Sequence, residues 1–213
     1  MGSFAQSGRA GPRPRRRLRG MGLGLVGLLG FCLWTGVVRS GWSDLLSNPL
    51  DDIIRSVHGA GLYRIDHGLS LLGTPAASVT LALLLSGLIA RRDPRHGVAI
   101  LIAFGLGLLV EAALKRWLFY PLTGSYPSGH ALRALFLALI AGRYLRRRPL
   151  AIGLVALAVA VGLSRISVGD HYSDEVLGAW LLGWSLALLS WPAPGQESPP
   201  ASARGDRRAL PAR

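Results

Sequence analysis

Six apolar runs follow one another along the chain, separated by short polar segments. They cover Met21–Val38, His67–Ala90, Gly97–Leu114, Gly129–Leu145, Pro149–Leu163 and Val176–Trp191. A helix needs about 20 residues to cross the hydrocarbon core of a bilayer, and shorter runs can lengthen through interfacial residues. The pattern predicts an all-α, polytopic membrane protein with a six-transmembrane-helix bundle over residues 21–192.

The segment between the first two runs has a different pattern. Asn48 can cap a helix, and Pro49 suits its first turn. Asp51 and Asp52 complement the dipole of such a helix. Apolar residues then repeat at helical spacing, at Leu50, Ile53, Ile54 and Val57. This pattern predicts a short amphipathic helix lying on the outer leaflet.

Basic residues gather in four segments that six alternating spans place on the same side of the membrane. These are residues 1–20, 91–95, 143–148 and 193–213. Lys and Arg are retained preferentially on the cytoplasmic side during insertion. Both termini are therefore predicted to be cytoplasmic, in a cell membrane, and residues 1–20 and 193–213 are predicted to be disordered tails.

The composition restricts the possible partners. The net charge of +13 is explained by basic tails beside anionic inner-leaflet lipid, so nucleic acid is not expected as a partner. The single cysteine, Cys32, rules out an intramolecular disulfide. The histidines and acids form neither an HExxH motif nor a carboxylate-rich cluster, so no metal or other cofactor is expected. The oligomeric state does not follow from the sequence.

Ionisable and anion-binding residues stand at the outer ends of the predicted spans. Such groups beside a membrane are costly and indicate function. They form three polar islands: Lys115; then Pro127, Ser128, Gly129 and His130; then Ser164, Arg165, His171, Asp174 and Glu175. Their recurrence on one side of the membrane predicts one shared site.

Several of these residues suit an anion rich in oxygen. Backbone N–H groups at Gly129, together with the dipole of the helix that begins there, form an anion pocket, and Ser128 can cap that helix. Arg165 offers a planar fork of donors, and Lys115, the only lysine of the chain, offers a compact cation. These features favour phosphoryl transfer.

Structural explanations stand beside the functional ones. Lys115 can form an ordinary ion pair with Glu111, one helical turn earlier. Asp174 and Glu175 favour the start of a helix whatever the function.

Taken together, the islands resemble the type 2 phosphatidic acid phosphatase family, which includes bacterial polyprenyl-diphosphate phosphatases and vanadium haloperoxidases. The pattern of that family has three pieces: KxxxxxxRP, PSGH and SRxxxxxHxxxD. The second is intact at residues 127–130, and the third matches at Ser164, Arg165 and His171. The final acid departs from the pattern, because Glu175 stands at its position and Asp174 one place earlier.

The first piece of the pattern is the poorest match. Counted from Lys115, the motif requires an arginine at position 122 and a proline at position 123. This sequence has Leu122 and Thr123 there instead. Arg116 and Arg133 are candidates to replace the missing arginine. Arg133 lies three residues after His130, close to the same helix face.

The resemblance implies catalytic roles for the two histidines and for one acid. His171 is expected to be the nucleophile, forming a phosphohistidine that water later hydrolyses. His130 is expected to protonate the departing lipid oxygen. An acid should orient the His171 ring, with Glu175 favoured over Asp174 and with Asp170 as a third possibility.

The resemblance also implies a phosphate cradle that needs no metal. Lys115, Arg165, Ser128 and the N–H of Gly129 are expected to stabilise charge on the equatorial oxygens.

The leading hypothesis is therefore a membrane lipid phosphate or diphosphate phosphatase that acts at the outer leaflet. Candidate substrates are undecaprenyl diphosphate, phosphatidic acid and phosphatidylglycerol phosphate. A phosphoryl transferase of the same fold is one alternative, and a catalytically weakened lipid-binding or transport protein is another.

Overall fold

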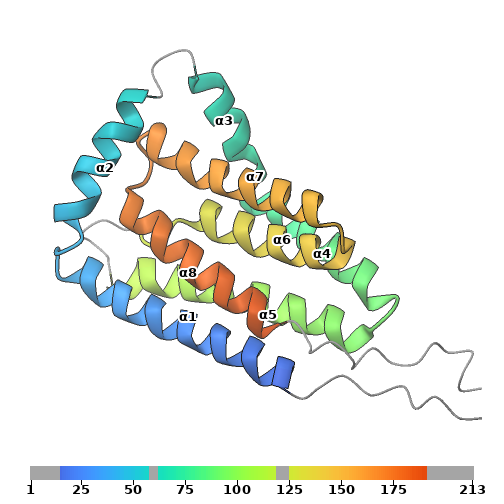
Figure 1. The fold of residues 1–213 in the computed structure, drawn as a ribbon. Coiled ribbons are helices and arrows are strands. Elements are labelled where there is room, and N and C mark those ends of the chain that lie inside the picture. Colours follow the sequence, from blue (N-terminus) through green and yellow to red (C-terminus); the bar gives the residue numbers. More distant parts are fainter. Residues whose placement is uncertain (1–14, 58–61, 119–124, 191–213) are drawn as a thin grey trace, which may run out of the picture.

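Helices joined by short turns make up the parts of the chain that the computed structural model describes, which are residues 15–57, 62–118 and 125–190 (Figure 1). In chain order the helices are α1 (Arg15–Arg39), α2 (Asp44–Val57), α3 (Tyr63–Leu72), α4 (Pro75–Ala90), α5 (Pro94–Ala113), α6 (Gly129–Leu145), α7 (Arg148–Ser167) and α8 (Ser173–Leu189). A π-helical turn, η1 (Leu114–Leu118), continues α5. Over these residues the predicted all-α class is confirmed.

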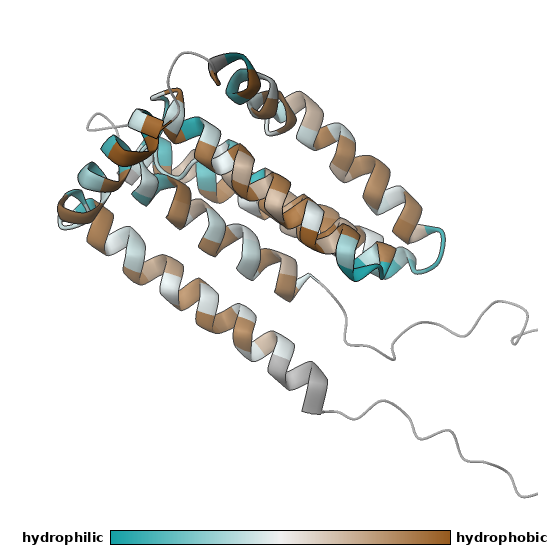
Figure 2. Cartoon of the chain, turned by 45° about the horizontal axis from the view of Figure 1, so that its top comes forward, coloured by the Kyte–Doolittle hydropathy of each residue, from teal (hydrophilic) through white to brown (hydrophobic). Residues whose placement is uncertain are grey.

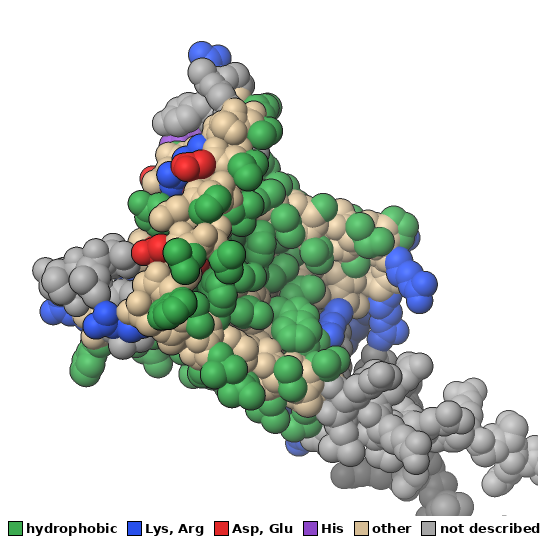
Figure 3. Space-filling model, turned by 60° about the vertical axis from the view of Figure 1, so that its left-hand side comes forward, with side chains coloured by type: hydrophobic (Ala, Val, Ile, Leu, Met, Phe, Trp, Pro, Cys, Tyr) green, Lys and Arg blue, Asp and Glu red, His purple; other side chains and the backbone are tan. Residues whose placement is uncertain are grey.

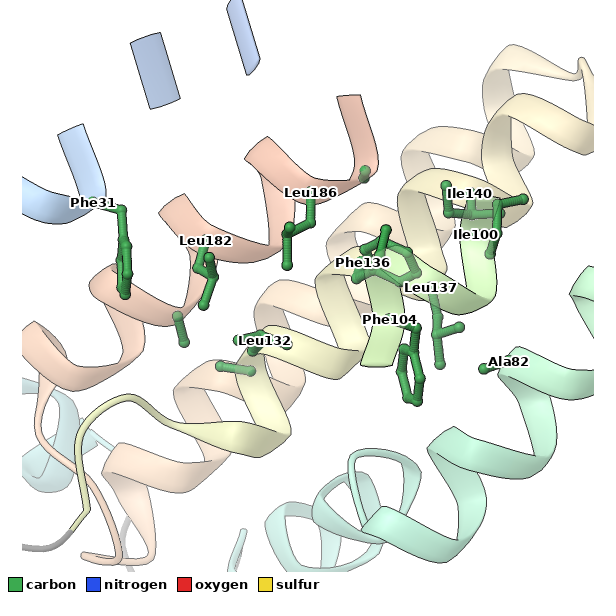
Figure 4. Packing of buried hydrophobic residues seen from close by; sticks show 14 of the residues in the cluster. Phe31, Ala82, Ile100, Phe104, Leu132, Phe136, Leu137, Ile140, Leu182 and Leu186 are labelled. Atoms are coloured by element: carbon green, nitrogen blue, oxygen red, sulfur yellow. The ribbon is translucent and has the colours of Figure 1, made fainter. Parts of the chain in front are cut away.

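Helix α6 lies at the centre of the bundle, packed against α4, α5, α7 and α8. Figure 4 shows how its Leu132, Phe136 and Ile140 meet side chains of the neighbouring helices, including Phe104 of α5 and Leu182 of α8. Helix α1 runs along α8, and α3 packs against α7. The central position of α6 matters because the PSGH segment directly precedes and begins it.

Two glycines allow α1 to approach α8 closely. A Cβ on Gly24 would lie 2.8 Å from Leu189 Cγ, and one on Gly27 would lie 2.7 Å from Trp184 Cζ3. A larger residue at either position would therefore require the facing side chains of α8 to shift. Small residues that let helix backbones approach are typical of membrane bundles, where packing has to provide the association energy.

Within the described ranges, three helical segments are long and apolar enough to cross a bilayer: Gly20–Arg39, Pro94–Trp117 and Arg148–Ser167. The pair Arg64–Leu72 and Pro75–Ala90 makes a fourth if it is taken as one broken span. Hydrophobic residues extend along the helices between polar turns (Figure 2). The chain is a multi-pass membrane protein. Helices α6 and α8 have 17 residues each, and the full count of six spans stays a prediction.

The predicted run His67–Ala90 is not one straight helix. It is divided between α3 and α4, which meet at an angle of 44° around Gly73 and Thr74. Pro75 disfavours helical backbone at the residue before it, and Thr74 is accordingly extended, with ψ of 152°. The Thr74 hydroxyl then accepts a hydrogen bond from the Ala77 N–H, so a new helix begins at this point.

The predicted interfacial helix exists as α2, but its start differs from expectation. It begins at Asp44, so Asn48 does not cap it and Pro49 lies inside it. Ser47 and Asp51 are buried against the protein, whereas the large apolar residues Leu45, Leu46, Leu50, Ile53 and Val57 are exposed. Figure 3 turns this side of the molecule forward and shows hydrophobic side chains over much of it. An outward apolar face suits a helix that lies in a membrane interface.

The predicted tails fall mostly outside the described residues. Residues 1–14 and 191–213 lie beyond them, and α1 begins at Arg15 rather than at residue 21. Leu122 and Thr123, where the first motif should have its arginine and proline, also lie outside the described ranges.

Candidate active site

The three polar islands meet at one end of the bundle. This end comprises η1, the start of α6, the end of α7 and the start of α8. The turns that carry residues 91–95 and 143–148 join the opposite ends of these helices (Figure 1). Glu111, the ion-pair partner of Lys115, lies against Gly129, and the Ser128 N–H donates to the Glu175 carbonyl. Residues from all three islands therefore lie together.

His171 is held by Glu175 across the first turn of α8. Its Nδ1 lies 2.7 Å from Glu175 Oε2, and both side chains are buried. The same carboxylate accepts the Tyr172 N–H at 3.2 Å and the Ser125 hydroxyl. A carboxylate only accepts hydrogen bonds, so the proton of this contact belongs to Nδ1. Nε2 is left as the basic nitrogen of the ring.

The other two acids considered for this role have different partners. Asp174 accepts the Ser43 hydroxyl at 2.6 Å and the Glu175 N–H at 2.8 Å, which ties the turn between α1 and α2 to the start of α8. Asp170 forms an ion pair with Arg165. Of the three acids, Glu175 is therefore the one whose carboxylate contacts the His171 ring.

Arg165 stands in the last turn of α7 beside the His171 loop. Its carbonyl accepts the N–H groups of both Asp170 and His171 at 3.1 Å, so the arginine and the histidine keep a fixed spacing. Its guanidinium contacts Asp170 and the Ser70 hydroxyl of α3. Its Nε is buried and has no hydrogen-bond partner within the described part of the chain.

Ser128 occupies the N-cap position of α6, as expected, but its hydroxyl makes no capping hydrogen bond. The side chain is fully buried, and its Oγ lacks a partner among the residues that the structure places. The Ser128 N–H donates to the Glu175 carbonyl at 3.2 Å, which joins the PSGH segment to the start of α8. Ser128 Oγ and Arg165 Nε are thus two buried polar groups that an anion could satisfy.

Lys115 and Arg133 share one acid. Glu111 Oε1 lies 2.9 Å from Lys115 Nζ, and Glu111 Oε2 lies 2.7 Å from Arg133 Nη1. The Glu111–Lys115 ion pair that the sequence suggested is therefore present. Arg133 also donates to the Gly73 carbonyl, from Nε at 3.2 Å and from Nη2 at 3.1 Å. Its buried guanidinium therefore braces α6 against α5 and against the break between α3 and α4. Arg116 lies on η1 and is exposed.

Gly129 is in close contact with Glu111. A Cβ at this position would lie 2.5 Å from Glu111 Cδ, so only glycine leaves room for the carboxylate between Lys115 and Arg133. The glycine of PSGH thus has a packing reason that the sequence did not reveal.

Several residues of the site were missed by sequence reasoning. Ser125 and Ser70 contact Glu175 and Arg165 from segments with no matching motif. Asp51, which the sequence assigned to the dipole of its own helix, accepts the Ser173 N–H at 2.9 Å and so caps α8. These contacts join residues far apart in the chain, and no local spacing indicates them. Among the described residues, no group of three or more His, Cys, Asp and Glu could hold a metal ion.

Comparison with known proteins identifies relatives of this chain. The model of the PAP2 superfamily matches residues 115–198, which include all three islands. The chain is 30% identical over 157 residues to the undecaprenyl-diphosphatase of Sulfolobus acidocaldarius, covering 64% of this chain and 70% of the relative. It is 28% identical over 148 residues to phosphatidylglycerophosphatase B of Bacillus subtilis, covering 60% and 73%.

Solved structures show the same fold. The crystal structure of a transmembrane PAP2-type phosphatidylglycerolphosphate phosphatase from Bacillus subtilis aligns with a TM-score of 0.65 and 23% identity, covering 78% of this chain and 93% of that one. LpxE of Aquifex aeolicus aligns with a TM-score of 0.57 and 20% identity, covering 68% and 94%. The chain belongs to the PAP2 superfamily and has its transmembrane fold.

Proposed function

We propose that this protein is a membrane phosphatase that removes the terminal phosphoryl group from lipid phosphates or diphosphates. The observation that carries the proposal is the buried His171–Glu175 pair beside Arg165 and Ser128, both of which have unpartnered polar atoms. The relatives named above are phosphatases of such lipids, which supports the same class of substrate.

The proposed reaction has two steps and runs through a phosphohistidine. Nε2 of His171 attacks phosphorus, the bond from phosphorus to the lipid oxygen breaks, and His130 gives its proton to that oxygen. Glu175 stabilises the positive charge that develops on the His171 ring. Water then attacks phosphorus and passes a proton to His130, and the P–N bond breaks to release phosphate.

The cradle for the transferred group is proposed to consist of Arg165, Lys115, Ser128 Oγ and the N–H of Gly129. The two cations balance charge on the equatorial oxygens, and the start of α6 adds its positive dipole end. Arg133 enters the proposal as a brace for Glu111, because its hydrogen bonds to Glu111 and Gly73 engage the guanidinium.

We further propose six spans, both termini in the cytoplasm and the site at the outer face. The arginine-rich turns and the site lie at opposite ends of the helices, which agrees with the preference of Lys and Arg for the cytoplasmic side. At the outer face a lipid headgroup and the catalytic residues would share one depth.

A panel of lipid phosphates tests the proposal. Purified protein in detergent should release phosphate from at least one of undecaprenyl diphosphate, phosphatidic acid and phosphatidylglycerol phosphate. His171→Ala should abolish release while the protein still inserts into the membrane, and the control His67→Ala, at an exposed position of α3, should keep it. Full activity of the His171 variant would refute the assignment of the nucleophile.

A further inference from the structure

Arg55 of α2 lies at the rim of the site and has no role in the proposed reaction. Its Nε donates to the Ile166 carbonyl at 3.3 Å, and its Cζ lies 5.3 Å from the centroid of the Tyr172 ring. Ile166 directly follows Arg165, and Tyr172 directly follows His171. The guanidinium is therefore held at two points, each adjacent to a residue of the site.

The described residues engage Arg55 through its Nε and through the face of its guanidinium. Nothing in the described ranges forms a hydrogen bond or ion pair with its two terminal nitrogens. The side chain is half-buried, and the Tyr172 ring below it is 46% exposed, so the pair is open to solvent at the edge of the site. A planar cation fixed in this way is suited to bind a phosphorus oxyanion with both terminal N–H groups.

The orientation of α2 indicates which part of a substrate would reach Arg55. The apolar residues Leu50, Ile53 and Val57 face away from the protein, which sets this helix at the depth of lipid headgroups. If the terminal phosphoryl group lies between His171 and Arg165, the leaving group extends from there toward the lipid. The next group along the headgroup then passes the rim.

We propose that Arg55 binds a second phosphorus oxyanion of the substrate, on the lipid side of the phosphorus that is attacked. This inference rests on the proposed function and narrows its substrate class. A lipid diphosphate has such a group in its inner phosphate, and phosphatidylglycerol phosphate has one in its phosphodiester. Phosphatidic acid has none. Arg55 thus makes the enzyme selective for lipids with two phosphorus groups. It also supplies a guanidinium to a site whose KxxxxxxRP motif lacks its arginine.

The test compares kcat/KM on the three lipids for wild type, Arg55→Ala and Arg55→Lys. Loss of hydrogen bonds to a charged group should lower kcat/KM of Arg55→Ala about 10- to 100-fold on undecaprenyl diphosphate and phosphatidylglycerol phosphate. On phosphatidic acid the change should be less than about threefold. Arg55→Lys should fall between, because it keeps the charge but loses the fork. The control Arg64→Ala, an exposed arginine on α3, should change none of the three values.

The outcomes separate this inference from the proposed function. An equal loss on all three lipids with a lower melting temperature would mean that Arg55 only holds α2 in place, and would overturn the inference. Unchanged kcat/KM of Arg55→Ala would also overturn it. In both cases the activity of wild type would still support the proposed function. Wild-type protein that releases phosphate from none of the lipids would contradict both.

Discussion

Replacing Glu175 by glutamine tests how the His171 ring is activated. The substitution keeps the length of the side chain and a carbonyl oxygen that can accept the Tyr172 N–H. It removes the negative charge that lies 2.7 Å from His171 Nδ1. The amide can also donate to Nδ1, which would place the ring proton on Nε2 and block its attack on phosphorus.

The expected loss follows from the burial of this pair. Both side chains are less than a tenth exposed, so solvent does little to screen the interaction. In a Ser-His-Asp triad, replacing the acid that orients the catalytic histidine by its amide lowers kcat about 10⁴-fold, because the ring is left in the wrong tautomer. Glu175→Gln should therefore lower kcat by about 10²- to 10⁴-fold, measured as phosphate release in detergent at saturating substrate.

The neighbouring acid provides a matched control. Asp174 is buried as Glu175 is, but it contacts Ser43 and the Glu175 N–H rather than the His171 ring. Asp174→Asn keeps an oxygen for one of these contacts and should lower kcat by less than about tenfold. Comparable losses in both variants, or full activity of Glu175→Gln with an unchanged melting temperature, would refute the argument.

Three further predictions concern the cradle and its supports. Phosphate release should be largely unchanged by EDTA. It should be inhibited by vanadate, which adopts the trigonal-bipyramidal geometry of the reacting phosphorus. Loss of activity in EDTA that Mg²⁺ or Zn²⁺ restores would contradict a metal-free cradle. Gly129→Ala should lower both kcat/KM and the melting temperature, because the alanine Cβ would meet the Glu111 carboxylate, which forms ion pairs with both Lys115 and Arg133. A fully active and stable variant would show that Glu111 can move freely and would contradict this prediction. Tyr126 directly precedes the PSGH segment, is fully buried and shares a hydrogen bond with Thr35 of α1. Burial raises the pKa of Tyr126 to about 12, so the stability that its neutral phenol contributes is complete below pH 10 and is lost as the pH rises toward 12. Thermal melts over this alkaline range should show that loss in wild type and a smaller one in Tyr126→Phe, and identical pH dependence would contradict it.

The sequence could predict those parts of the site that depend on short spacing. His171 and Glu175 are four residues apart at a helix start, and Glu111 and Lys115 are four apart at a helix end; both pairs make contact. Helical geometry brings Glu111 and Lys115 together. His171 precedes α8 by two residues and meets Glu175 in the turn that caps this helix. The apolar runs likewise predicted the helices, because burial in lipid or in a bundle requires apolar surface over the whole length of a span.

Contacts between distant segments could not be predicted in this way. Arg133 was a candidate for phosphate binding, and only the packing of α6 beside the break at Gly73 shows that its donors are engaged. Asp51 is 122 residues from Ser173 and belongs to a helix whose polar face turns toward the protein. Whether a polar face meets water or protein depends on the neighbouring helices, which a local pattern does not contain.

Trapping the covalent intermediate tests the central claim most directly. Wild-type protein in detergent is mixed with a lipid substrate labelled in its terminal phosphate, quenched in alkaline denaturant within one turnover, and digested for peptide mass spectrometry. We expect an acid-labile phosphoryl group on the peptide that contains His171, and none in His171→Ala. Label on a different residue, or rapid phosphate release with no labelled peptide, would contradict the proposed mechanism.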